Sequence, residues 1–262
     1  MSNSGKNFSV TFLGTGTSQG VPVIACGCEV CQSNDPKDKR LRVSVLIEYH
    51  GKNYVIDTGP DFRQQMLREN VQSLEALIYT HEHKDHLAGM DDVRAYNFKQ
   101  KKDMEIYCSE AVEKALRREF YYVFEANKYP GVPAVNLNRI DNSPFRINDM
   151  EVTPVEVMHY KLPVQAFRIE DFTYITDAKT VSEEERAKIR GTKVLVVNAL
   201  RREEHISHFN LEQALEFIRD INPEKAYLTH ISHLFGKHED IEKELPENVF
   251  AAYDGLHIEM NH

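Results

Sequence analysis

Four side chains that could bind metal ions are gathered in one short stretch of the sequence, at His81, His83, Asp85 and His86. They follow an apolar run at 74–79, which predicts a buried strand that ends at this cluster. In an extended segment, residues two apart share a face, so His81 and His83 can bind one ion while Asp85 and His86, where the chain turns, can reach a second. A solvated polar turn is the simpler interpretation, but imidazoles and a carboxylate in this order favour a site for two metal ions.

Three cysteines form a second candidate metal site, at Cys26, Cys28 and Cys31. Their spacing is too tight, and their number is odd, for a disulfide framework. Thiolates are soft ligands that suit zinc, and a tetrahedral site needs a fourth ligand from elsewhere in the fold. Reduced cysteines without a metal are the alternative, and we favour a structural zinc loop at 26–31.

These two motifs resemble those of a known family. The cluster at 81–86 resembles the signature motif of the metallo-β-lactamase-fold hydrolases, and the three-cysteine loop is similar to that of the phosphoribosyl 1,2-cyclic phosphate phosphodiesterase subgroup. The similarity extends from Gly14 to the turn at Asp254 and Gly255. It implies an α/β fold, a four-layer αβ/βα sandwich with a dinuclear site at the sheet edge.

The resemblance also implies ligands at the ends of later strands. His159 and His230 follow apolar segments, as does Asp177, which would bridge the two ions. The two ligand sets would be His81, His83, His159 and Asp177 for one ion, and Asp85, His86, His230 and Asp177 for the other.

Two further residues would support these sites. Asp57 would orient the metal loop instead of binding a metal. His233 would be the fourth ligand of the cysteine site, and an ordinary surface histidine is the alternative for it.

His208 is the main candidate for catalysis. It lies just before a helix that we expect to begin at Asn210, because Gln213 three residues later completes a capping pattern. The positive end of that helix and the imidazole can both address a phosphate. The resemblance favours His208 over His205 and implies that Asp85 also takes part. A hydroxide bridging the metal ions would attack, and His208 would stabilise the transition-state charge or protonate the leaving oxygen.

The implied function is hydrolysis of a small anionic phosphodiester, cyclic or open. The cofactors would be two divalent ions at the active site, zinc or manganese, and one structural zinc. Three alternatives stay open: a hydrolase of a lactone, thioester or other ester; a carrier-like binding protein of the same fold; and a transfer-RNA 3′-processing nuclease. A β-lactamase is disfavoured because those enzymes often have cysteine where this chain has Asp177.

Composition limits the partners and the location. The chain has 262 residues, of which 41% are hydrophobic, and we predict a single domain over 1–262. A formal net charge of −9 disfavours nucleic acid as a partner and allows a small anionic substrate. The segment 1–7 is not an apolar signal, and no run approaches the roughly 18 apolar residues of a membrane span. We therefore predict a soluble, cytoplasmic protein without a membrane partner, and the subgroup suggests a homodimer.

The remaining pattern predicts the elements that position these residues. The glycine-rich stretch 14–20 is expected to be a structural turn, and Phe62, Met66, Leu67 and Gln65 to form the core face of a helix. Cys108 is expected to be a buried core residue. The stretch 121–148 has no clear periodicity and is either a lid or a surface loop. His238, His257 and His262 are assigned no role. The predicted strands are 8–13, 43–47, 54–57, 74–79, 104–108, 152–159, 172–177, 193–198 and 227–230, with a strand or hairpin at 249–260, and the predicted helices are 61–70, one around 91–94, 110–120 and one from 210.

Overall fold

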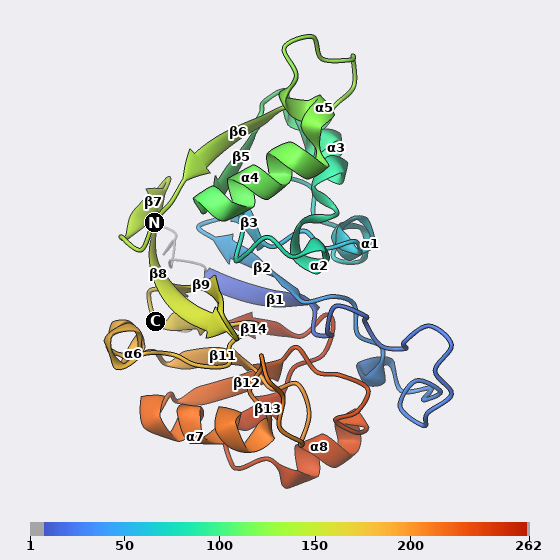
Figure 1. The fold of residues 1–262 in the computed structure, drawn as a ribbon, viewed down its shortest axis with the longest axis vertical. Helices are drawn as coiled ribbons and strands as arrows, with labels where there is room; N and C mark the ends of the chain where they lie inside the picture. The colour runs from blue at the N-terminus through green and yellow to red at the C-terminus, as the bar shows by residue number, and fades with distance from the viewer. Residues whose placement is uncertain (1–7, 261–262) are drawn as a thin grey trace, which may run out of the picture. The chain divides into compact units, whose positions relative to one another are not determined.

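The computed structural model describes residues 8–260, and the chain forms two compact units. Unit 1 contains residues 8–13, 44–141 and 257–260, and unit 2 contains residues 14–43 and 142–256. The N-terminal segment 1–7 and His262 lie outside the described residues. Each unit is built around one seven-stranded mixed sheet (Figure 1).

The sheet of unit 1 has the strand order β14-β1-β2-β3-β4-β5-β6. Its strands are β1 (Phe8–Gly14), β2 (Ser44–Tyr49), β3 (Lys52–Ile56), β4 (Ala76–Ile78), β5 (Met104–Cys108), β6 (Val135–Arg139) and β14 (His257–Glu259). Strands β3 to β6 are parallel, whereas β14 pairs antiparallel with β1 and β2 with β3. Parallel strands need crossover connections, and helices follow β3, β4 and β5.

The helices of unit 1 are short. They are α1 (Phe62–Arg68), α2 (Lys84–Leu87), the 3-10 helix η2 (Met90–Val93), α3 (Arg94–Gln100), α4 (Glu110–Glu119) and α5 (Tyr121–Phe124). Phe62, Met66 and Cys108 are buried in the core as predicted. The prediction for Leu67 is wrong: it is 63% exposed, because successive residues of a helix point in directions about 100° apart and only one narrow face of α1 reaches the sheet.

The sheet of unit 2 has the order β13-β12-β11-β10-β9-β8-β7. Its strands are β7 (Phe145–Ile147), β8 (Met150–His159), β9 (Leu162–Ile169), β10 (Phe172–Tyr174), β11 (Val194–Asn198), β12 (Lys225–Thr229) and β13 (Val249–Ala251). Strands β10 to β13 are parallel and β7 to β10 antiparallel. The unit also has η1 (Pro36–Asp38), α6 (Glu183–Ile189), α7 (Leu211–Ile221) and α8 (His238–Glu244).

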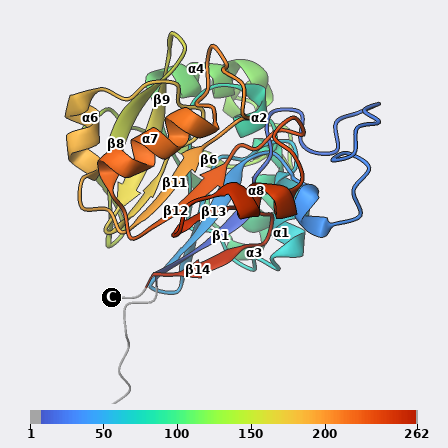
Figure 2. The ribbon, with the colours of Figure 1, turned by 90° about the horizontal axis from the view of Figure 1, so that it is seen from below.

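Helix α7 lies against the sheet of unit 2 and forms much of its core (Figure 2). The predicted helix start is confirmed: Asn210 Oδ1 accepts from Gln213 N at 2.9 Å, and Gln213 Oε1 accepts from Asn210 N at 3.3 Å. The apolar residues Ala214, Phe217 and Ile218 face the strands and are buried.

Several stretches differ from the prediction. The segment 121–148 contains α5, β6 and β7, and β6 pairs along its whole length with β5. Within β6 the apolar Val135 and Leu137 alternate with Asn136 and Asn138, and both apolar side chains pack against the core of unit 1, so the prediction missed a short strand pattern. Strands β13 and β14 belong to different sheets and are no hairpin. Strand β9 and helices α6 and α8 were not predicted.

The predicted α/β class is confirmed by the two mixed sheets and their helices. Within residues 8–260, no helix is both long enough and apolar enough to cross a membrane.

Candidate metal centres

The predicted ligands lie at the carboxyl ends of strands in each sheet. In unit 1, β3 is followed by Asp57 and β4 by the loop 79–83 that leads into α2. In unit 2, β10 is followed by Asp177 and β12 by His230. Loops at the carboxyl ends of parallel strands are the usual position of a functional site in α/β folds.

Three of these residues adopt a left-handed backbone conformation. The φ angles are +65° for Asp57, +56° for Asp177 and +57° for His230. This region is unfavourable for residues with a Cβ atom, least so for aspartate and histidine among them, and persists only where the surroundings fix it. Such conformations cluster at functional sites, and here they occur directly after β3 at Asp57, directly after β12 at His230, and in the loop that follows β10 at Asp177.

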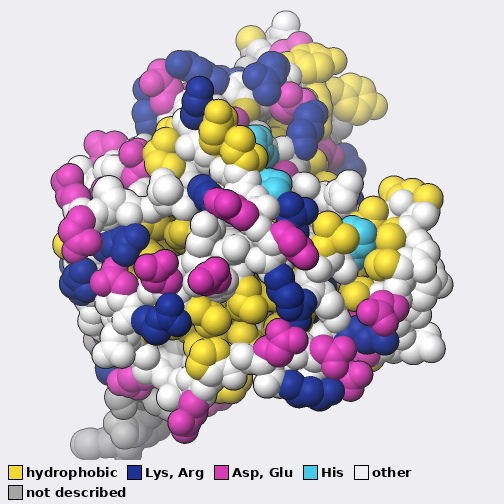
Figure 3. All heavy atoms as spheres, turned by 60° about the horizontal axis from the view of Figure 1, so that its bottom comes forward, with side chains coloured by type: hydrophobic (Ala, Val, Ile, Leu, Met, Phe, Trp, Pro, Cys, Tyr) yellow, Lys and Arg dark blue, Asp and Glu magenta, His cyan; other side chains and the backbone are white. Residues whose placement is uncertain are grey.

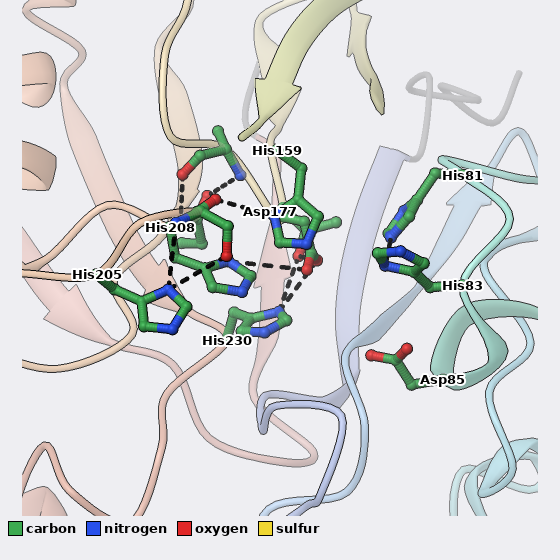
Figure 4. A network of polar contacts seen from close by, with 12 residues as sticks. His81, His83, Asp85, His159, Asp177, His205, His208 and His230 are labelled. Carbon is green, nitrogen blue, oxygen red and sulfur yellow. Dashed lines mark hydrogen bonds and ion pairs between the residues drawn. The ribbon is translucent and has the colours of Figure 1, made fainter. Parts of the chain in front are cut away.

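His81 and His83 bring two ring nitrogens together in unit 1. The distance from His81 Nε2 to His83 Nδ1 is 3.0 Å, and the two rings are nearly perpendicular (Figure 4). Two nitrogens bound to one zinc at about 2.0 Å in a tetrahedral arrangement lie about 3.3 Å apart. The pair therefore fits a single ion.

Asp85 and His86 form a second donor pair on α2. Asp85 Oδ2 lies 3.3 Å from His86 Nε2. Because α2 begins at Lys84, the chain turns after His83, which separates this pair from the first. One loop thus offers two donor pairs, each with the spacing of two ligands on one ion.

Asp57 fixes this loop from inside the core. Its carboxylate accepts from Thr80 N at 2.9 Å and from Thr80 Oγ1 at 2.7 Å, and its Oδ2 is 2.7 Å from His86 Nδ1. With Nδ1 of His86 occupied, Nε2 is the nitrogen turned towards Asp85. Burial raises the pKa of the Asp57 carboxyl, whereas its contact with His86 lowers it. Thr80 was not singled out from the sequence, because nothing in its spacing distinguishes it from other threonines.

In unit 2, Asp177 lies among three histidines. Asp177 Oδ2 is 3.1 Å from His230 Nδ1 and accepts from Thr176 Oγ1 at 2.7 Å. Asp177 Oδ1 is 3.8 Å from His208 Nδ1. The ring of His208 lies between those of His159 and His230, with centroids 4.5 and 4.7 Å away (Figure 4). This cluster joins carboxylate and imidazole groups, which are ligands suited to zinc.

The backbone orients His159. Its Nδ1 lies 2.9 Å from the carbonyl oxygen of Ser207, so Nδ1 carries the proton and Nε2 is left as the ligand atom. His205 stacks on His208 with a centroid distance of 5.2 Å and accepts from Ser207 N at 3.3 Å. Burial, with the nearby His230, lowers the pKa of His208 to about 2, which favours the neutral imidazole.

The cysteine loop meets His233 within unit 2. His233 Nδ1 is 3.4 Å from both Cys26 Sγ and Cys28 Sγ, and the four ligand atoms including Cys31 Sγ lie within 4.8 Å of one another. Sulfur and nitrogen ligands of one tetrahedral zinc are about 3.5 Å apart. The N–H of Cys31 and the ring of His233 lower the pKa of Cys28 to about 6, which favours a thiolate. All four cysteines are free thiols, and Cys108 lies in the core of unit 1.

A buried polar cluster supports the chain near the cysteine loop. Arg40 donates to Thr15 Oγ1 at 2.8 Å and to Ala252 O at 2.5 Å, and its Nη2 is 3.4 Å from His238 Nδ1. His238 N donates to Asp38 Oδ1 at 2.7 Å. Burial, with the nearby Arg40, lowers the pKa of His238 to about 4. The sequence gave His238 no role, because its partners lie about 200 residues away along the chain.

The chain is similar in sequence and in fold to known proteins. Residues 52–231 match the family described as "Beta-lactamase superfamily domain". A crystal structure of a new diphosphatase from the PhnP family is 35% identical, with a TM-score of 0.91 and 97% of each chain covered. Zinc-bound PqqB from Methylobacterium extorquens shares the fold, with 18% identity, a TM-score of 0.77 and coverage of 96% and 100%.

A curated relative is longer than this chain. An octanoyltransferase of Porphyromonas gingivalis is 39% identical over 247 residues, which are 93% of this chain and 50% of that protein. The chain therefore spans about half the length of that relative.

Proposed function

The chain belongs to the β-lactamase superfamily domain family, and from this premise we propose that it is a metal-dependent phosphodiesterase. Membership confirms the resemblance inferred from the histidine loop and the cysteine loop. The fold is the α/β sandwich of the metallo-β-lactamase fold, and the chain is a hydrolase of that class. The type of bond that is hydrolysed, a phosphodiester, and the class of substrate are our proposal.

The observation that carries the proposal is the arrangement of two donor pairs on one loop, His81 with His83 and Asp85 with His86. We infer that each pair would hold one ion. The family resemblance implies that His159, Asp177 and His230 would supply the remaining ligands. Two such ions, zinc or manganese, supply Lewis acidity towards phosphoryl oxygens and lower the pKa of a bound water.

Two side chains would act on the substrate itself. His208 is 8% exposed and its ring packs between those of His159 and His230, so the ring is held in place by packing. We assign it the role of hydrogen-bonding the phosphate oxygens or the leaving oxygen. Asp85, whose carboxylate is 14% exposed, would accept a hydrogen bond from the attacking water.

The surface supports a small substrate. Among the described residues drawn in Figure 3, Lys and Arg side chains are interspersed with Asp and Glu, and no area of one sign extends across this face. Nucleic acid is held mainly by clustered cations, so this face offers no broad phosphate-binding surface. The similarity to a diphosphatase also favours a phosphoryl substrate over a carboxylic ester. A cytoplasmic location and a homodimer stay predictions.

The octanoyltransferase similarity favours one second candidate, hydrolysis of an acyl ester or thioester. The similarity covers half of that protein, so the printed activity does not by itself belong to the matching half. The metal centre proposed here could polarise an acyl carbonyl as well as a phosphoryl group.

The cysteine site would hold a structural zinc. Its four ligands fill a tetrahedral shell and leave no open position for a substrate. We propose that this zinc stabilises the loop 23–33 and takes no part in hydrolysis.

One experiment tests the function and both kinds of site. Metal content is measured by elemental analysis beside turnover of bis(p-nitrophenyl) phosphate, p-nitrophenyl octanoate and an octanoyl thioester. We expect roughly three ions per chain, with two at the dinuclear centre and one on the cysteines. Asp177→Asn should lose ions and turnover, whereas His208→Asn should keep the ions and lose roughly 100-fold in kcat. Cys31→Ala should lose one zinc, and the exposed Asp240→Asn is the control.

The outcomes separate the candidates. A metal-loaded chain that hydrolyses the octanoyl substrates and no phosphodiester supports the second candidate. Ions on the cysteines alone, with no turnover after zinc or manganese is added, favour a binding protein and contradict both enzymatic proposals.

A further inference from the structure

Asn198, the last residue of β11, has a fully buried side chain that bonds twice to a single residue. Its Oδ1 accepts from Ala178 N at 2.7 Å, and its Nδ2 donates to Ala178 O at 2.9 Å. The side-chain amide therefore pairs with the backbone of Ala178 as two opposite residues of neighbouring strands pair with each other. This pairing holds the chain immediately after Asp177.

The same carbonyl group has a second donor. Ala178 O also accepts from Phe209 N at 2.8 Å, and Phe209 follows His208. Phe209 O in turn accepts from Leu200 N at 3.0 Å, two residues after Asn198. This junction of hydrogen bonds links Ala178, which follows Asp177, to Phe209, which follows His208. Among these bonds, only the two of Asn198 are made by a side chain.

The junction lies beside a strained segment. Asp177 has a φ of +56°, which persists only where neighbouring groups determine it. Removal of the Asn198 amide would leave the buried N–H of Ala178 without its acceptor, and a buried donor without a partner is costly. The segment would then move to find another acceptor, and the carboxylate of Asp177 would move with it.

We propose that Asn198 is a positioning residue, which fixes Asp177 and His208 relative to each other through the backbone of Ala178. It touches neither a proposed ligand atom nor the substrate. The kinetic consequence rests on the proposed function, whereas the effect on the backbone and on metal binding does not. Loss of a group that orients metal ligands typically lowers metal affinity or activity by about 10- to 100-fold.

The test compares Asn198→Leu with a matched control, Thr173→Val. Thr173 is also fully buried in the same sheet, and it donates to Thr192 Oγ1 at 3.0 Å, near the amino end of β11. Hydrogen exchange is measured on the metal-free chain, metal affinity by competition with a chelating dye, and kcat and KM at saturating metal. Asn198→Leu should speed exchange at residues 175–180 selectively and lower both metal affinity and kcat about 10- to 100-fold, with KM changed less than about threefold. Thr173→Val should leave all four quantities near their wild-type values.

If Asn198→Leu does not fold, a second variant, Asn198→Asp, tests the same hydrogen bonds. In Asn198→Asp the introduced carboxyl can donate to Ala178 O when protonated and repels it when ionised. The difference in melting temperature between this variant and the wild type should therefore shrink as the pH is lowered. A difference in melting temperature that does not change with pH would contradict the two hydrogen bonds between Asn198 and Ala178.

Three results would overturn the proposal: unchanged exchange at 175–180 in Asn198→Leu, faster exchange spread evenly over unit 2, or metal affinity within twofold of the wild type. If the wild type hydrolyses no phosphodiester, the proposed function fails, and exchange and metal affinity still decide the role of Asn198.

Discussion

Asp57 Oδ2 lies 2.7 Å from His86 Nδ1, and both side chains are fully buried. The same carboxylate accepts two hydrogen bonds from Thr80, so a single buried side chain holds both ends of the loop that carries the proposed ligands. A histidine ligand is typically fixed in this way by a carboxylate on its other ring nitrogen.

Asp57→Asn should weaken metal binding without removing a ligand. The amide has nearly the same shape, but its NH2 group cannot accept a hydrogen bond, so it satisfies fewer of the donors from Thr80 and His86. We expect metal affinity and turnover to fall about 10- to 100-fold. Chelator competition and steady-state kinetics measure the two effects. The exposed Asp103→Asn is the control, and an Asp57→Asn chain with wild-type affinity would show that Asp57 does not orient His86.

Gly89→Ala should destabilise unit 1. A Cβ atom at Gly89 would lie 2.2 Å from Gly59 O and 2.7 Å from Phe62 Cβ, while Gly89 N donates to Thr58 O at 2.8 Å. The loop after α2 would have to move away from the loop after β3, at a cost of about 2–3 kcal/mol in the free energy of unfolding.

Urea unfolding of the purified chain measures this loss. Gly27→Ala is the matched control, because a Cβ atom there meets nothing within 4 Å. Equal stability of the two variants would mean that the close approach of Gly89 to Gly59 and Phe62 relaxes without cost.

His238 should make the fold sensitive to mild acid. Burial and the positive charges of Arg40 and Lys37 lower its pKa to about 4 from an ordinary 6.5, although Asp35 and Asp38 oppose this. As the pH falls, His238 therefore becomes protonated near pH 6.5 in the unfolded chain but only near pH 4 in the folded chain. This contribution is fully present above pH 6.5 and is lost as the pH falls towards 4, to the extent of about 3 kcal/mol.

His238→Gln removes the titrating group and keeps an acceptor for Arg40. We expect the wild type to lose more free energy of unfolding than the variant between neutral pH and about pH 4.5, by roughly 2–3 kcal/mol. Denaturant titrations at the two pH values measure both losses. Parallel losses in the two chains would assign the acid sensitivity to other groups.

The sequence predicted best where a pattern is local. The run of His81 to His86 after an apolar strand and the pairing of Asn210 with Gln213 are both contained within a few residues, and the structure has the strand, the turn and the capped helix at those positions. Cys108 was likewise recognisable as a core residue from its own strand.

The sequence predicted least where a role depends on distant partners. Asn198 looks like any strand-end asparagine until Ala178, 20 residues earlier, is seen to face its amide. Strand β6 has the period of a strand, with Val135 and Leu137 packed against the core, but its alternation covers only five residues, and its full-length pairing with β5 is visible only in the fold. The assignment of metal ligands across His81, His159, Asp177 and His230 rests on the family resemblance and stays a prediction.

The pairing of β14 with β1 has a consequence for how the chain is made. Thr11 and His257 are in contact although they are 246 residues apart, and β14 covers the outer side of β1 in the sheet of unit 1. At a synthesis rate of about 5–20 residues per second, β1 leaves the ribosome roughly 10–50 s before its edge partner exists. During that interval one edge of an apolar strand has unpaired backbone groups, which is the kind of surface that associates with other nascent chains. The parallel strands β10 to β13 of unit 2, by contrast, are all synthesised before β14, so the sheet of unit 1 gains its edge strand only after the sheet of unit 2 has all its strands.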